Sequence, residues 1–222
     1  MTMEDREARG CGTASTQVAA TDLSIAQESP HMHDDGLTIR RLAPELKDDF
    51  PRYFEGAAFA DNPKWKSCYC QFLYVDHTKV NWSTRTAAEN RIAACDRIAC
   101  ERMQGLLAYR NGQVVGWCNA APRDLLDSFA DEPIPDAAQV GQITCFVVAR
   151  EHRRAGVARA LLEEACAMLR EQGLKVAEAN PSRDAKSDAQ NHFGPLSLYL
   201  TSGFEVVKER EDGLVVVRRS LG

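Results

Sequence analysis

Residues 145–158 read CFVVAREHRRAGVA, and this stretch decides how the chain is interpreted. Its apolar first part, which begins at about Gly141, is typical of a central strand. Small residues surround Gly156, and apolar residues at helical spacing follow it, so we expect a strand, a tight turn and a helix. The N-terminus of a helix presents unpaired N–H groups, which makes the turn a candidate anion site. An ordinary strand-to-helix connection that binds nothing is the alternative.

Patterns on both sides of this stretch predict one domain with a mixed α/β sheet. Asn111-Gly112 between two apolar runs is a strong hairpin signal, and Gly173 is placed to end the helix that follows the turn. Ser83 or Thr84 is the expected N-cap of an earlier helix. The expected strands are 37–42, 105–109, 113–122, 141–149, 174–180, 204–210 and 214–220, and the expected helices are 45–57, 84–103, 154–171 and 194–202.

The negative charge of the chain is concentrated at its N-terminus. The 222 residues carry 27 basic and 32 acidic side chains, a net charge of −5, and residues 1–35 account for all of it with seven acids and two bases. This acidic segment has no aromatic residue, so we expect a disordered tail over 1–35 and a folded domain over 36–222. Net acidity argues against nucleic-acid binding, and the lack of a long apolar run argues against a membrane span. We therefore expect a cytoplasmic protein.

The cysteines are expected to be thiols. Eight are present without an export signal, which favours a reducing compartment. Cys68 and Cys70, with His77 and Cys95, form the group that most resembles a metal site, but structural zinc sites space their paired cysteines two to four residues apart. We expect buried or cavity-lining thiols and no metal.

Two segments carry a resemblance to a known family. Arg153-x-x-Gly156-x-Ala158 after a strand resembles the acetyl-CoA-binding signature of the GNAT (Gcn5-related N-acetyltransferase) family, and the segment from Tyr199 to Phe204 is similar to the one that ends the family's last helix. The expected element order over residues 36–220 also resembles the GNAT fold. The resemblance implies an α/β GNAT fold, a single domain whose mixed, centrally splayed β-sheet is flanked by helices.

The resemblance also implies a site for acetyl-CoA as co-substrate. The strand would lie beside the pantetheine arm, with its N–H groups toward the thioester carbonyl, and the turn would hold the pyrophosphate. Tyr199 would be the catalytic general acid to the CoA thiolate, since a tyrosine keeps its proton where a thiol has lost one. A core tyrosine bonded to the backbone is the alternative. The residues implied to bind acetyl-CoA are Phe146, Val147, Val148, Arg153, Arg154, Ala155, Gly156, Val157, Ala158 and Asn180.

The chain departs from the family pattern in several places. Arg150 stands where many members have proline, and the connector 181–192 is longer and more polar than usual, which leaves the roles of Asn191 and His192 open. Gln142 and Thr144 stand where the central strand commonly carries an acid, so matching assigns no general base. Three weak candidates for the base are His77, Glu89 and Asp124, and a water chain is as good.

The expected reaction is direct attack of a primary amine on the thioester in a ternary complex. A ping-pong mechanism through Cys145 or Cys118 is disfavoured, because neither has a histidine adjacent in sequence. Two alternative functions remain. One is a non-catalytic acyl-CoA-binding regulator on the same fold, and the other is a nucleotide-binding module that uses the turn at Gly156.

The acceptor side is expected in the aromatic stretch 65–82, in the helix that carries Asn90 and Arg91, and in the loop 124–136. The loop holds five acids and no base and would attract a small cationic amine with an aromatic or apolar body, unless it is simply solvated. A homodimer is implied by analogy with relatives.

Overall fold

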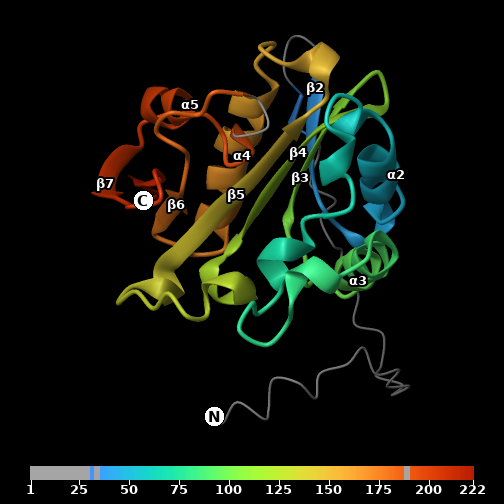
Figure 1. The fold of residues 1–222 in the computed structure, drawn as a ribbon. Coiled ribbons are helices and arrows are strands. Elements are labelled where there is room, and N and C mark those ends of the chain that lie inside the picture. The colour runs from blue at the N-terminus through green and yellow to red at the C-terminus, as the bar shows by residue number, and fades with distance from the viewer. Residues whose placement is uncertain (1–30, 33–35, 188–190) are drawn as a thin grey trace, which may run out of the picture.

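The fold is a single mixed sheet flanked by helices, described by a computed structural model for residues 31–32, 36–187 and 191–222 (Figure 1). The sheet has eight strands in the order β1-β2-β3-β4-β5-β6-β8-β7. Among these pairs β5 and β6 are parallel, and the others are antiparallel. The strands are β1 (His31–Met32), β2 (Leu37–Arg41), β3 (Gly105–Arg110), β4 (Gln113–Pro122), β5 (Val140–Val148), β6 (Val176–Ala179), β7 (Glu205–Glu209) and β8 (Val215–Ser220).

The helices begin and end close to the predicted boundaries. They are α2 (Asp49–Glu55), α3 (Ala87–Ala99), α4 (Val157–Glu171) and α5 (Leu196–Thr201). The N-cap of α3 is Thr86 rather than Ser83 or Thr84, because Thr86 and Glu89 form a reciprocal capping box. The aromatic stretch 61–82 forms neither a strand nor an α-helix but a series of short 3₁₀ turns.

Two hydrophobic clusters cover the two faces of the sheet. On one face Leu161, Ala165 and Leu169 of α4 belong to a cluster with residues of β2, β3, β4, β5 and β6, and Tyr199 of α5 joins the same cluster. On the other face Phe50, Phe54 and Trp117 are part of a cluster that joins α2, α3 and the 3₁₀ turns to the sheet. Figure 1 shows α2 and α3 on one side of the central strands, with α4 and α5 on the other.

The predicted hairpin forms as the sequence indicates. Asn111 and Gly112 both have positive φ, at 50° and 75°, as a two-residue turn between antiparallel strands requires. Gly173 follows α4 with φ of 85° and ends that helix. Within the predicted tail, His31–Met32 pairs with β2 as a short antiparallel strand, and residues 1–30 and 33–35 lie outside the described residues. No helix in the described ranges is long and apolar enough to cross a membrane.

Candidate functional site

Strands β5 and β6 separate halfway along the sheet, and a cavity of about 1180 Å³ lies beside the half of β5 that does not pair with β6. Their pairing ends at Ile143 and Ala179. A β-bulge stands at the same height, because Asn119 and Ala120 of β4 pair with Cys145 and Ile143 and leave Thr144 as the extra residue. The bulge bends β5 away from β6, so Phe146, Val147 and Val148 line the cavity instead of pairing with β6.

The turn after β5 brings the N-terminus of α4 to one end of this cavity. Gly156 is the N-cap in the left-handed conformation, with φ of 79°, and no side chain of the described residues caps the helix. The first N–H groups of α4 are thus available to an anion, and the helix dipole favours one there. Of the predicted turn residues, those that line the cavity are Arg153, Arg154, Gly156, Val157 and Ala158, while Ala155 is not among the lining residues.

Arg153 is held by groups on both sides of the cavity. Its Nε donates to the Val148 carbonyl at 3.0 Å, and its two terminal nitrogens donate to the Asp61 carboxylate at 2.6 and 3.0 Å. The hydrogen bond from Arg153 lowers the pKa of Asp61. In this structure Arg153 therefore ties the loop after α2 to the turn before α4, and Arg154 is the exposed neighbour.

The segment Asn191–Phe193 occupies the hydrogen-bonding positions that the resemblance reserves for acetyl-CoA. The Phe146 N–H donates to the His192 carbonyl at 2.7 Å. The Tyr199 hydroxyl donates to the Phe193 carbonyl at 2.6 Å and is fully buried, and this burial raises its pKa well above the ordinary value. Tyr199 is not among the cavity-lining residues. Both predicted donors thus have backbone partners in the same short segment.

Asn180 lies just past the end of β6, as predicted, but is not among the residues that line the cavity. Its side chain is 9% exposed, and its Oδ1 has no hydrogen-bond partner within the described ranges. An unpaired buried carbonyl oxygen is costly, so this atom is an acceptor without a donor among the described residues.

Aromatic side chains and thiols form another wall of the cavity. Trp65, Phe72 and Trp82 belong to the stretch that sequence analysis expected there, whereas Tyr69 and Tyr74 of that stretch are buried in the core. Phe54 and Phe59 also line the cavity and were missed, since Phe54 in the predicted helix 45–57 reads equally as core packing and no local pattern singles out Phe59. The thiols in this wall belong to Cys68, Cys70 and Cys145.

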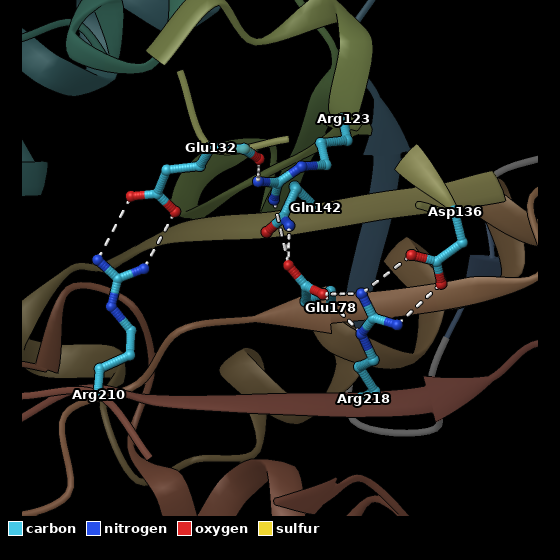
Figure 2. A network of polar contacts seen from close by, with 7 residues as sticks. All are labelled: Arg123, Glu132, Asp136, Gln142, Glu178, Arg210 and Arg218. Atoms are coloured by element: carbon cyan, nitrogen blue, oxygen red, sulfur yellow. Dashed lines mark hydrogen bonds and ion pairs between the residues drawn. The ribbon is translucent and has the colours of Figure 1, made fainter. Parts of the chain in front are cut away.

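The acidic loop 124–136 lies elsewhere, against the expectation that it forms part of the acceptor side. None of its residues is among those lining the cavity. Figure 2 shows Glu132 paired with Arg210 at 3.1 Å and Asp136 paired with Arg218 at 2.8 Å. Arginines from the C-terminal hairpin therefore neutralise two of the five acids. These arginines lie far from the loop in the sequence, so local sequence patterns do not predict the pairing.

The candidate bases do not line the cavity, and of the candidate metal ligands only Cys68 and Cys70 do. His77, Glu89 and Asp124 do not belong to its lining, and Glu89 is engaged in the capping box of α3. Within the described ranges, no group of three or more His, Cys, Asp or Glu side chains is placed to hold a metal ion. The cavity therefore joins a helix N-terminus without a side-chain cap in the described residues to a wall of rings and thiols.

Comparison with known proteins identifies the family. The profile of the Acetyltransferase (GNAT) family matches residues 46–191, so the chain belongs to this family. No curated protein sequence matches the chain. The following solved structures share the fold at low sequence identity.

A GNAT-family acetyltransferase from Streptococcus pneumoniae is 17% identical with a TM-score of 0.52, covering 84% of this chain and 99% of its own. The structure of yncA from Salmonella typhimurium with acetyl-CoA is 18% identical with a TM-score of 0.51, covering 84% and 94%. The PaiA N-acetyltransferase from Thermoplasma acidophilum, in complex with coenzyme A, is 16% identical with a TM-score of 0.51, covering 83% and 98%.

Proposed function

We propose that this acetyltransferase moves an acetyl group from acetyl-CoA to a primary amine, by direct attack in a ternary complex. The observation that carries the proposal is the cavity at the splay, because it joins the open N-terminus of α4 to a second wall large enough for an acceptor. The helix end and Arg154 suit the negative phosphates of the co-substrate. The edge of β5 beyond its pairing with β6 suits an extended arm that needs backbone partners, once the His192 carbonyl is displaced from the Phe146 N–H.

The Phe146 N–H and the Tyr199 hydroxyl act on the two atoms where charge develops. The N–H stabilises the thioester oxygen, and the hydroxyl donates to the departing thiolate. Each donor now bonds a carbonyl of residues 192–193, so acetyl-CoA competes with these carbonyls for the same N–H and O–H. The raised pKa of Tyr199 keeps its proton in place at neutral pH until the thiolate forms.

The test is thiol release from acetyl-CoA with a panel of amines, comparing the wild type with Tyr199→Phe. We expect kcat to fall about 10²-fold in the variant while KM for acetyl-CoA stays the same. Tyr109→Phe is the matched control, because it removes another buried hydroxyl, bonded to Asp49 at 2.8 Å, outside the cavity. Full kcat in Tyr199→Phe would refute the general-acid role.

The alternative is a non-catalytic acyl-CoA-binding regulator. Thermal-shift measurements with acetyl-CoA, CoA, ATP and NAD show which of these ligands stabilises the fold. Stabilisation by acetyl-CoA without thiol release from any amine identifies the regulator, and stabilisation by ATP or NAD alone identifies a nucleotide-binding module.

A further inference from the structure

Exposed aromatic rings line part of the cavity. Trp65 is 37% exposed and Phe72 is 44% exposed, although both are large apolar side chains. Trp82 stands edge-on to Phe72, with ring centroids 5.2 Å apart, so the two rings form one wall. Rings left uncovered inside a concavity are typical of a small-molecule site, whereas rings that only stabilise a loop are normally covered.

This aromatic wall reaches the part of β5 where the acetyl group is expected. Cys70 of this wall lines the cavity together with Cys145, which lies next to Phe146 on β5, and the Trp117 indole N–H donates to the Cys70 sulfur at 3.1 Å. Burial raises the pKa of Cys68 to about 11 and that of Cys70 well above its ordinary value. At neutral pH these two thiols are uncharged, and they give the wall an apolar surface next to the reacting carbon.

Among the described residues, the cavity lining includes a single carboxylate, that of Asp61. Arg153 binds both of its oxygens, at the end of the cavity that faces the co-substrate phosphates. The lining otherwise carries positive side chains such as Lys64 and Arg154. A second ammonium group on the acceptor would lose its hydration here without gaining an anionic partner.

Taking the acetyltransferase function proposed above as its basis, we propose that the acceptor is a primary amine on an aromatic body without a second positive charge. The ring packs between Trp65, Phe72 and Trp82, and the neutral amino group points toward the β5 edge. The amine nitrogen forms a bond to the acetyl carbon as the C–S bond breaks. The nitrogen loses one proton to water, the thiolate takes up one, and the products are the N-acetyl amine and CoA.

The test compares amines in the acetyl-CoA thiol-release assay. The panel contains 2-phenylethylamine and tryptamine as aromatic monoamines, 2-cyclohexylethylamine as an apolar monoamine of similar size, and putrescine and spermidine as polycations. We expect kcat/KM for the aromatic monoamines to exceed that for the polycations at least about tenfold, with the cyclohexyl compound between them. Equal or faster turnover of spermidine overturns this assignment and leaves the proposed function standing. No thiol release from any amine overturns both.

Two variants test whether the aromatic wall causes the preference for aromatic monoamines. Trp65→Ala and Phe72→Ala should each raise KM for 2-phenylethylamine about tenfold and leave KM for acetyl-CoA unchanged. Ile92→Ala is the control, because Ile92 is 60% exposed on α3 and is not among the cavity-lining residues. All three side chains are exposed, so thermal unfolding should be nearly unchanged. Unchanged KM values in both wall variants would overturn the assignment.

Discussion

Tyr199 illustrates how the role of a single residue depends on its hydrogen-bond partner. The sequence left two alternatives, a general acid and a core tyrosine bonded to the backbone. In this structure the hydroxyl bonds the Phe193 carbonyl, and the same contact holds it at the edge of the splay behind residues 192–193. Under the function proposed above, Tyr199 is a core tyrosine bonded to the backbone while the Phe193 carbonyl is in place. It becomes the general acid once acetyl-CoA displaces that carbonyl.

At the same scale, Cys166 predicts a pH dependence of stability. Cys166 lies on the face of α4 that packs on the sheet, and burial there raises the pKa of its thiol from 9 to about 12. Because the folded pKa is the higher one, the folded protein keeps a proton that the unfolded chain loses above pH 9. The stabilising contribution is complete below pH 9 and decreases as the pH rises toward 12. From pH 9 to 10 this thiol should lower the unfolding free energy by about 1 kcal/mol.

Urea unfolding of the wild type and Cys166→Ala at pH 7, 9 and 10 measures this contribution. Other groups titrate in the same window and cancel in the difference between the two proteins. We expect the variant to be the less stable at pH 7 and the gap to narrow above pH 9. A gap that stays constant from pH 7 to 10 would contradict the raised pKa.

At the scale of elements, the segment between β6 and α5 connects the two predicted donors. Asn191–Phe193 bonds both, and Gly194 connects it to α5 with φ of 84°. A Cβ at Gly194 would lie 3.0 Å from Cε2 and 3.2 Å from the hydroxyl of Tyr199, and 3.2 Å from Cδ2 of Phe146. Only glycine fits this position without shifting the tyrosine.

Gly194→Ala should therefore impair both stability and turnover. The left-handed backbone and the crowded Tyr199 ring should together cost about 1–3 kcal/mol of unfolding free energy, and kcat should fall because the hydroxyl moves. Gly213→Ala is the matched control, with φ of 83° and no atom within 4 Å of the added Cβ, so it tests the backbone strain alone. Denaturant unfolding and thiol release measure both effects. Equal stability losses and full activity in both variants would show that Tyr199 is not displaced.

At the scale of the whole molecule, a buried ion network holds the sheet together where β5 and β6 still pair. Glu178 of β6 accepts from Gln142, its register partner on β5, from Arg123 after β4 and from Arg218 on β8 (Figure 2). Arg123 and Glu178 are each about 5% exposed. Segments far apart in the sequence thus meet at one carboxylate, just below the point where the strands separate.

Loss of this carboxylate should destabilise the entire fold. Glu178→Ala leaves the buried Arg123 guanidinium without its ionic partner, and we expect a loss of about 3–5 kcal/mol in unfolding free energy. Glu209→Ala removes an exposed partner of Arg183 and should cost less than about 1 kcal/mol. Denaturant titration of the two variants compares them directly. Similar losses in both would mean that burial adds nothing to the Glu178 network.

Much of the fold was predictable because its signals are local. The hairpin at Asn111-Gly112, the strand before Gly156 and the helix after it depend on residues close together in the chain. The boundary of α3 was misplaced, since Thr84 and Thr86 are both acceptable caps, and only Glu89, at the right distance from Thr86, completes a capping box. The turn residues of the co-substrate side followed from the same local pattern, and all but Ala155 line the cavity.

The acceptor side was less predictable because its charges and rings depend on distant partners. Five acids in one loop indicated attraction for a cation, but Arg210 and Arg218, more than 75 residues downstream, neutralise Glu132 and Asp136. Likewise, the sequence indicated that the stretch 65–82 is rich in aromatic rings. Only the fold decided that Trp65, Phe72 and Trp82 face the cavity while Tyr69 and Tyr74 face the core.

The sequence by itself therefore determined the family, the element order and the strand-turn-helix that forms one end of the cavity, because backbone propensity and periodicity act over a few residues. Only the tertiary structure decided which groups face the cavity and which donors already have partners. Charge pairing, burial and the hydrogen bonds to the carbonyls of residues 192–193 depend on segments that meet only in the folded structure. The local sequence around each residue therefore does not predict them.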